Sequence, residues 1–170
     1  DEDVPLVVPE VNPEAVKGHK GIIANPNCST IIMVVVANPL HKAKTLKRLV
    51  ASTYQATSGA GAQGMAELEL QAKQLLNGEG VEPSAFAHQI GFNLIPHIDV
   101  FQENGYTKEE MKMVKESRKI LGIPDLKVSC TCVRVPVLRA HSETLNMEFE
   151  DDISVAEAQE LLTAAAGVTL

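Results

Sequence analysis

Residues 25–37 read Asn-Pro-Asn-Cys-Ser-Thr-Ile-Ile-Met-Val-Val-Val-Ala, a turn followed by an uninterrupted apolar run. The β-branched residues of the run favour a strand by intrinsic propensity. Turn formers bracket the run, with Asn25-Pro26-Asn27 before it and Asn38-Pro39 after it, and the segment between them has the length of a helix. We therefore predict a buried helix over residues 28–37 that begins at the cysteine.

Cys28 would lie in the first turn of this helix, which makes it a candidate nucleophile. Unpaired backbone N–H groups and the positive end of the helix dipole favour a thiolate there. His141, far downstream in Arg134-Val-Pro-Val-Leu-Arg-Ala-His141, can supply a base. A buried structural cysteine and a structural or surface histidine are the alternatives, and each is the commoner role when the residue is taken alone.

The composition indicates a globular domain that binds neither nucleic acid nor an anionic membrane. The chain has 170 residues, 45% of them hydrophobic, and a net charge of −7. This length suffices for one domain with a core, and the negative charge argues against polyanionic partners. The longest apolar run, Ile31–Ala37, is too short to cross a bilayer. Three cysteines indicate a reducing compartment. The expected location is the cytoplasm or, in a photosynthetic eukaryote, the plastid stroma.

The remaining sequence predicts an alternation of strands and helices. Strands are expected at residues 5–12, 21–25, 45–54, 127–135 and 144–149. Helices are expected at residues 64–76, 107–121 and from 154 to a stop at Gly167, the last two opened by capping boxes. This order predicts an α+β or α/β domain built on a mixed, mostly antiparallel sheet with helices on one face.

A glycine motif, Gly59-Ala-Gly61-Ala-Gln-Gly64, follows a predicted strand and opens a predicted helix. It has the form of the dinucleotide fingerprint, but that fingerprint also requires a second strand ending in an acid about twenty residues later. The corresponding region, residues 78–84, is a loop, so a complete dinucleotide-binding unit is excluded here. Two interpretations of this glycine motif stay open: a purely structural turn, or a turn that lines a ligand.

Several polar residues are difficult to place in a core. Gln55 follows a strand into the glycine motif, and Arg134 interrupts an apolar strand on the same face as Cys130 and Cys132. Glu109 and Lys112 share a face of a predicted helix. A surface or salt-bridged arginine and a solvent-exposed ion pair are the alternatives for Arg134 and for the helical pair.

Four segments together resemble the aspartate-β-semialdehyde dehydrogenase family. They are Ile23-Ala-Asn-Pro-Asn-Cys-Ser-Thr30, Ser52-Thr-Tyr-Gln-Ala-Thr-Ser-Gly-Ala-Gly61, Tyr106-Thr-Lys-Glu-Glu-Met-Lys112 and Val133-Arg-Val-Pro-Val-Leu-Arg-Ala-His-Ser-Glu143. The resemblance runs from about Pro5 to the last residue. It implies the fold of the C-terminal catalytic domain of glyceraldehyde-3-phosphate dehydrogenase.

The resemblance also implies a role for each matching residue. Catalysis would involve Cys28 as the acyl-thioester nucleophile, His141 as the general acid/base and Gln55 as the group that orients the substrate. The substrate would be held at its α-carboxylate by Arg134, at its α-amino group by Glu109, and at its phosphate by Asn27 and Lys112. The nicotinamide part of NADP would lie against Ser58 and Gly59. No metal is implied.

The implied reaction is the NADP-dependent conversion of L-aspartyl-4-phosphate to L-aspartate-4-semialdehyde, a step toward lysine, threonine, methionine and isoleucine. Residues 1–27 would be the end of a nucleotide-binding domain, and residues 28–170 a catalytic and dimerisation domain that is incomplete at its C-terminus. Most of the NADP site would then lie outside this chain, which alone would turn over little. A homodimer or tetramer is expected, formed largely through the sheet, and an uncovered apolar sheet face would be its sign.

Two other function classes stay open. The chain could be a non-catalytic dimerisation module, a truncated part of such an enzyme. It could also be a cysteine hydrolase that uses Cys28 and His141, although this reading lacks a third triad member and leaves Arg134 and Glu109 unexplained.

Overall fold

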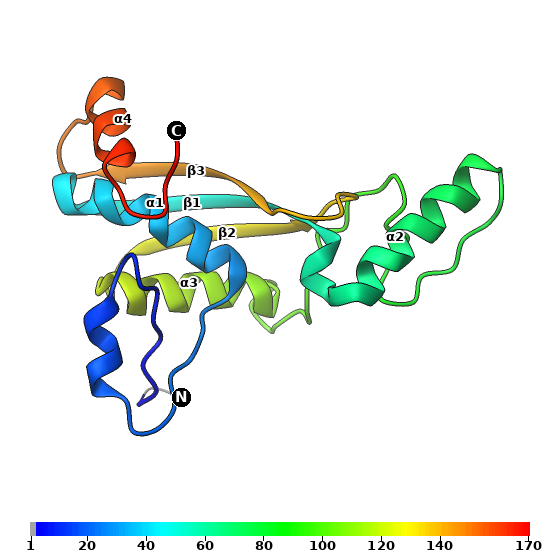
Figure 1. Ribbon diagram of the computed structural model, residues 1–170, viewed down its shortest axis with the longest axis horizontal. Helices are drawn as coiled ribbons and strands as arrows, with labels where there is room; N and C mark the ends of the chain where they lie inside the picture. Colours follow the sequence, from blue (N-terminus) through cyan, green and yellow to red (C-terminus); the bar gives the residue numbers. More distant parts are fainter. Residues whose placement is uncertain (1–2) are drawn as a thin grey trace. The chain divides into compact units, whose positions relative to one another are not determined.

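The computed structural model describes residues 3–170 (Figure 1). In chain order the elements are η1 (Pro13–Gly18), α1 (Cys28–Lys44), β1 (Leu46–Gln55), η2 (Thr57–Ala60), α2 (Gly61–Leu76), α3 (Lys108–Leu121), β2 (Lys127–Arg134), β3 (Ser142–Phe149) and α4 (Val155–Thr163). Among these residues, no helix is both long enough and apolar enough to span a lipid bilayer.

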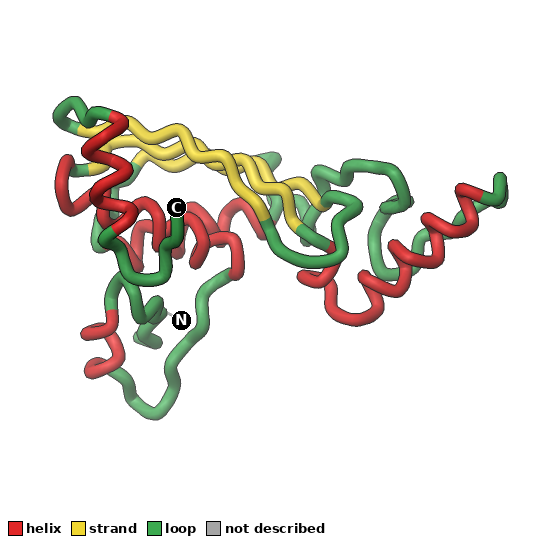
Figure 2. The backbone as a smooth tube through the Cα atoms, turned by 45° about the horizontal axis from the view of Figure 1, so that its top comes forward, coloured by secondary structure: helices red, strands yellow, loops and turns green. Residues whose placement is uncertain are grey.

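The sheet has three strands in the order β2-β1-β3 (Figure 2). The N–H of Glu150, just after β3, donates to the carbonyls of Lys44 and Thr45, just before β1, so these strands run antiparallel. The N–H of Val135 donates to the carbonyl of Gln55, so the ends of β2 and β1 lie together and this pair is parallel. The predicted class, an α+β or α/β fold with a mixed sheet, is confirmed, but the sheet has one antiparallel and one parallel strand pair and so is not mostly antiparallel as predicted.

Each strand turns alternate residues toward the core. In β2, Cys130, Cys132 and Arg134 are buried, whereas Ser129 and Thr131 are exposed. This is the two-residue period that places successive side chains on opposite faces. The burial of Arg134 with the two cysteines follows the predicted alternation and excludes a surface role for this arginine.

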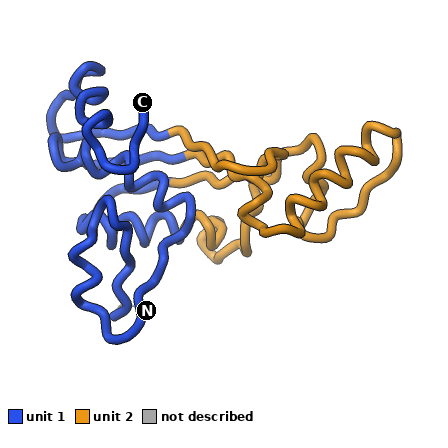
Figure 3. Tube along the Cα trace, viewed as in Figure 1, with its two compact units in different colours: residues 1–51, 112–129, 145–170 blue, residues 52–111, 130–144 orange. Residues whose placement is uncertain are grey.

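The described chain forms two compact units (Figure 3). Unit 1 consists of residues 1–51, 112–129 and 145–170, and unit 2 of residues 52–111 and 130–144. The three strands and α3 contribute residues to both units. Each unit is described below by itself.

Unit 1 is built around α1, which packs against α4. Its core includes Val8, Val34 and Ile120, from the N-terminal segment, α1 and α3. Figures 1 and 2 both show α1 and α3 on the same side of the strands. The helices therefore cover one sheet face in this unit, as predicted.

Unit 2 is built around α2 and the long segment that follows it. Leu68 of α2 packs with Ile90 and Ile95 of that segment, and the partly buried Phe86 packs against them. Figure 1 shows the segment after α2 running back along the helix. Because Gln55, Glu109, Arg134 and His141 all belong to this unit, its packing positions most of the predicted site.

The predicted strands at residues 5–12 and 21–25 are wrong. They are joined only by one isolated parallel bridge between Leu6 and Ala24. The side chain of Asn12 accepts from the Val8 N–H at 2.8 Å and donates to the Leu6 carbonyl at 2.9 Å. This local bonding curls the segment, and Pro5 and Pro9 remove two of the donors that a strand ladder would need.

The helix predicted at residues 28–37 is confirmed but is longer than expected. It passes through Asn38 and Pro39 and ends at Lys44. A proline inside a helix removes one backbone hydrogen bond, and here the burial of Met33, Val34 and Leu40 offsets that loss.

The capping box predicted for α3 is confirmed in full, and the one predicted for α4 is confirmed for one of its two hydrogen bonds. At α3, the Thr107 N–H donates to Glu110 and the Glu110 N–H donates to the Thr107 hydroxyl. At α4, the Ser154 hydroxyl accepts from the Glu157 N–H. The predicted stop at Gly167 is too late because α4 ends at Thr163; Gly167 instead occupies a left-handed turn with φ +77°.

Candidate active site

Arg134, the last residue of β2, has a fixed guanidinium. Its Nη1 donates to the carbonyl of Ala56 at 2.7 Å, and its Cζ lies 5.8 Å from the centre of the Phe86 ring. Backbone bonds in both directions between Arg134 and Ile95, of 2.9 and 3.0 Å, hold the residue from the other side. The side chain is thus pre-oriented by one carbonyl and one aromatic face before any ligand binds.

A cavity of about 260 Å³ lies beside this guanidinium. Phe86, His97, Asp99 and Arg134 are among the residues that line it. A buried arginine at the wall of a small cavity is suited to recognise a carboxylate.

His141 lies just before β3 and is half-buried. The preceding residue, Ala140, has a φ of +70°, an unfavourable value for a residue with a side chain. The Nδ1 of His141 accepts from the Ala56 N–H at 3.0 Å. Burial, and then the charge of Arg134, lower the pKa of His141 below its ordinary value, while Glu109 opposes them.

Gly59 is the point at which these two side chains meet. A Cβ built on Gly59 would lie 2.8 Å from Nη1 of Arg134 and 3.2 Å from both Cε1 and Nε2 of His141. A side chain at this position would therefore have to displace Arg134, His141 or both. Gly59 itself is exposed and Ser58 is half-buried, so the backbone of this turn is accessible to a flat ligand.

Gln55 and Glu109 form a buried polar pair in the same unit. The Gln55 Nε2 donates to Glu109 Oε1 at 3.1 Å, and its Oε1 accepts from the Thr53 hydroxyl at 2.9 Å. Gln55 is 1% exposed and Glu109 is 6% exposed. The buried position of Glu109 excludes the solvent-exposed ion pair that its helical spacing with Lys112 would also allow.

Cys28, Asn27 and Lys112 belong to unit 1. Cys28 is the first residue of α1 and is exposed, which excludes a buried structural cysteine. The Asn27 side chain caps this helix by accepting from the Thr30 N–H at 3.1 Å. Its backbone N–H donates to Glu116 at 2.8 Å, and Lys112 is half-buried on α3.

The other two cysteines do not compete for the role of nucleophile. Burial raises the pKa of Cys130 and of Cys132 to about 12. Both therefore stay as thiols at neutral pH. Among residues 3–170, no group of three or more His, Cys, Asp or Glu side chains is arranged to hold a metal ion.

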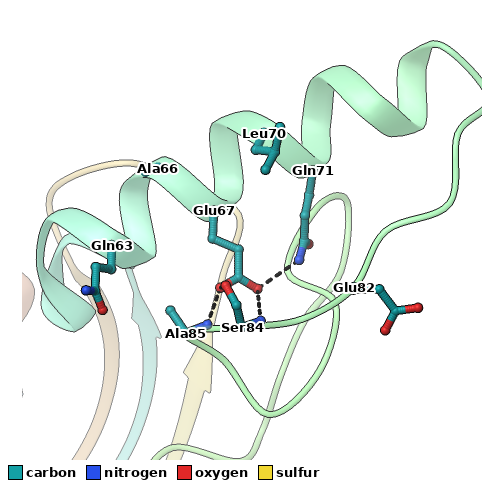
Figure 4. A pocket seen from close by; sticks show the side chains of 8 residues that line it. All are labelled: Gln63, Ala66, Glu67, Leu70, Gln71, Glu82, Ser84 and Ala85. Carbon is teal, nitrogen blue, oxygen red and sulfur yellow. Dashed lines mark hydrogen bonds between the residues drawn. The ribbon is translucent and has the colours of Figure 1, made fainter.

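A second cavity, of about 450 Å³, lies between α2 and the segment that follows it (Figure 4). Glu67 points from α2 to the backbone of Ser84 and Ala85 and accepts from both N–H groups, from the Ser84 hydroxyl and from Gln71. Gln71 in turn accepts from the N–H groups of Ile90 and Gly91, each at 2.9 Å. These contacts anchor a loop, and no predicted site residue lines this cavity.

Sequence reasoning missed three groups that position the site: the Ala56 backbone, Phe86 and the Glu67–Gln71 pair. The Ala56 N–H and carbonyl act through main-chain atoms, and Phe86 lies in a loop, so neither leaves a pattern. Glu67 and Gln71 did leave a pattern in the sequence, because they lie on the same helix face as the buried Gly64 and Leu68. Two polar residues on a buried helical face indicate a buried hydrogen-bonding role.

Comparisons with known proteins agree with the resemblance seen in the sequence. The model of the family described as semialdehyde dehydrogenase, dimerisation domain, matches residues 37–170. The aspartate-semialdehyde dehydrogenase of Aquifex aeolicus is 57% identical over 171 residues, covering 99% of this chain and 50% of the relative. That of Bacillus subtilis is 51% identical over 178 residues, covering 100% and 51%. The chain thus spans about half the length of the curated relatives that it matches.

Solved structures give the same relationship. The structure of aspartate semialdehyde dehydrogenase II from Vibrio cholerae complexed with ASA matches with a TM-score of 0.96 and 48% identity, covering 98% of this chain and 50% of that one. The structure of aspartate semialdehyde dehydrogenase with NADP from Candida albicans matches with a TM-score of 0.68 and 30% identity, covering 96% and 46%. The chain therefore belongs to the family of semialdehyde dehydrogenase dimerisation domains.

Proposed function

We propose that this chain is the catalytic and dimerisation part of an aspartate-semialdehyde dehydrogenase that converts L-aspartyl-4-phosphate to L-aspartate-4-semialdehyde. The observation that carries this proposal is the convergence of Arg134 and His141 on Gly59 in a member of the family. An arginine for a carboxylate and a histidine for proton chemistry are the groups that an amino-acid aldehyde requires. In this proposal, residues 1–27 end a nucleotide-binding domain and residues 28–170 form the catalytic domain.

In this function Cys28 is the nucleophile. Its thiolate attacks the acyl carbon of the acyl phosphate, the C–O bond to phosphate breaks, and a thioester remains on the sulfur. The position of Cys28 at the start of α1 supports this role because the helix N-terminus stabilises negative charge. Asn27, the cap of the same helix, and Lys112 would hold the phosphate that leaves.

The substrate's amino-acid end is recognised by residues of unit 2. Arg134 binds the α-carboxylate, and its bond to the Ala56 carbonyl restricts the guanidinium to one orientation. Glu109 binds the α-ammonium group. Gln55 orients the reacting carbonyl, and its bond to Glu109 links the two recognition groups.

The reduced cofactor, NADPH, would supply the hydride that reduces the thioester carbonyl. Ser58 and Gly59 would lie against its nicotinamide part, and the accessible backbone of this turn fits a planar ring. The Candida albicans relative was solved with NADP, which supports this cofactor. His141 acts on the oxygen of the thiohemiacetal formed on Cys28, which then collapses to the aldehyde and the thiolate.

The chain would also form a homodimer, or a tetramer built from dimers. The family is that of a dimerisation domain. The outward faces of β1 and β2 bear Tyr54, which is 44% exposed, and Thr131, which is also exposed. This face is more polar than the apolar one expected from the sequence, and such an interface would rely on hydrogen bonds as well as apolar contact.

The test is the phosphate-dependent oxidation of aspartate semialdehyde by the full-length protein with NADP, followed at 340 nm. Cys28→Ala should lower kcat by at least about 10³-fold, the order of magnitude expected for loss of a covalent nucleophile. Arg134→Ala should mainly raise KM, because it removes binding present in both ground and transition states. Cys130→Ala is the matched control and should keep its turnover, since that buried thiol has no role in the chemistry. Full activity of Cys28→Ala would contradict the proposal.

A further inference from the structure

The contact between Ala56 and His141 determines which imidazole nitrogen carries the proton. A backbone N–H can only donate, so Nδ1 of His141, 3.0 Å from the Ala56 nitrogen, must present its lone pair. A neutral imidazole with a lone pair on Nδ1 has its proton on Nε2. The contact therefore selects the Nε2–H tautomer.

The surroundings strengthen this selection. Ala56 is fully buried, so its N–H has no access to bulk water if His141 turns away. The backbone just before His141 is also held in place: the N–H groups of Thr57 and Ser58 donate to the carbonyls of Val137 and Leu138 at 2.8 and 3.0 Å. The loop that carries His141 is thereby tied to the turn that carries Ala56.

The same contact opposes the imidazolium. Protonation of Nδ1 would bring two N–H groups face to face and leave the buried Ala56 donor without an acceptor. Arg134 adds a second cation, since its Nη1 and the Nε2 of His141 both approach Gly59. The pKa of His141 is lowered by burial and then by Arg134, against the opposing charge of Glu109. The ring is therefore neutral at physiological pH, with its one N–H on the nitrogen that faces Gly59.

We propose that the Ala56 N–H is a positioning group that holds His141 as a neutral hydrogen-bond donor through Nε2, directed at the oxygen of the substrate's reacting carbonyl. This inference rests on the proposed function and narrows the role of His141 within it. The Nε2–H donates to the substrate oxygen while that oxygen carries negative charge, both when the thioester forms and when it is reduced.

The first test is a two-bond ¹H–¹⁵N correlation spectrum of ¹⁵N-labelled protein. His141→Gln identifies the signals of His141 by their disappearance. We expect a protonated Nε2 and an unprotonated Nδ1 at neutral pH, with uptake of the second proton only below the ordinary histidine pKa of about 6.5. A proton on Nδ1 at neutral pH, or conversion to the imidazolium with an ordinary pKa, would overturn the inference.

An amide-to-ester replacement isolates the Ala56 donor. Replacing Ala56 with its α-hydroxy acid analogue removes the N–H and keeps the side chain, so the Nδ1–H tautomer should appear and the pKa of His141 should rise. The matched control is the same replacement at Leu46, whose N–H donates to Nδ1 of His41 at 3.0 Å. It should change the signals of His41 and leave those of His141 unchanged. An ester at Ala56 that leaves the His141 spectrum unchanged would contradict the inference.

The two proposals fail separately. If the spectrum shows the Nε2–H tautomer but the full-length protein does not act on aspartate semialdehyde, the proposed function is wrong and the tautomer assignment stands. If the protein is active but His141 carries its proton on Nδ1, the function stands and this inference is wrong.

Discussion

At the scale of single residues, Gly59 shows how an absent side chain can define a site. Two side chains of the candidate site, Arg134 and His141, occupy the space that a Cβ would need. Gly59→Ala should displace both and lower kcat/KM by about 100-fold, the cost of misplacing reacting groups by about 1 Å. Steady-state kinetics of the full-length protein would measure this. Gly80→Ala is the control because a Cβ there meets nothing within 4 Å; equal losses in both variants would refute the argument.

Glu143 is a buried carboxyl with no role in the proposed chemistry. Both of its oxygens are buried without a hydrogen-bond partner, and burial raises its pKa from 4.5 to about 8. The folded state therefore holds this proton more tightly than the unfolded state. By linkage, the free energy of unfolding should fall as pH rises from about 4.5 to about 8, and this loss is complete above that window.

Glu143→Gln should remove this pH dependence. Between pH 5 and pH 8 the wild type should lose on the order of 2 kcal/mol more stability than the variant, measured by urea denaturation at each pH. The comparison uses only the change in the free energy of unfolding with pH, so any pH-independent effect of burying the Gln amide cancels. Glu148→Gln, at an exposed position on the same strand, is the control and should follow the wild type. Parallel curves for Glu143→Gln and wild type would show that Glu143 is already ionised in the folded protein.

The residues of the site were more predictable than their contacts. The sequence singles out Arg134 and His141 as candidates because they lie in a short motif that interrupts an apolar pattern. Their dependence on the Ala56 backbone could not, because main-chain donors and acceptors are the same at every residue. Phe86, which stacks on Arg134, is distant in sequence and lies in a loop without periodicity.

At the scale of elements, local signals predicted the caps at the starts of α1, α3 and α4. The capping boxes of α3 and α4 and the cap of α1 are short-range hydrogen bonds between neighbouring residues, so the sequence alone specifies them. The end of α1 depends on tertiary burial around Leu40, which outweighs the proline. The two N-terminal strands failed for the opposite reason: Asn12 provides local bonds that compete with a ladder.

The loop after α2 depends on one carboxylate. Burial alone would raise the pKa of Glu67, but hydrogen bonds from Ala85 and Ser84 overcome it and the net pKa is lowered. Glu67→Ala removes the acceptor of the Ser84 and Ala85 N–H groups and should cost about 1–3 kcal/mol of stability. Hydrogen exchange should rise at residues 84–91. Glu69→Ala, at an exposed position on the same helix, should leave exchange in that loop unchanged; equal exchange in the two variants would show that Glu67 does not anchor it.

At the scale of the whole molecule, most of the proposed substrate-binding groups are contained in one unit. Gln55, Glu109, Arg134 and His141 lie in unit 2, where their mutual contacts are established within a single packed body. Cys28 lies in unit 1 and is positioned by the start of α1. The proposal thus assigns substrate recognition mainly to unit 2 and nucleophilic attack to unit 1.

The proposed dimer predicts a specific effect of charge on the outward face of β1 and β2. Tyr54 and Thr131 lie on that face and are exposed. In a symmetric dimer each substitution is introduced twice. The double variant Tyr54→Lys/Thr131→Lys therefore places four positive charges near one interface. Like charges placed close together at an interface cost several kcal/mol. The dissociation constant should rise by at least 100-fold, measured by sedimentation equilibrium of the full-length protein.

The control for this prediction is Leu76→Lys at the end of α2. Leu76 is 77% exposed, so the substitution adds a positive charge and removes an exposed apolar side chain without touching the sheet. It should leave the dissociation constant within about threefold of wild type, because surface substitutions outside an interface have small effects. If the sheet variant remains dimeric while the Leu76 variant dissociates, the contact between subunits lies on α2. Because the sheet face is only moderately apolar, added salt should partly restore the sheet variant's dimer by screening the introduced charges.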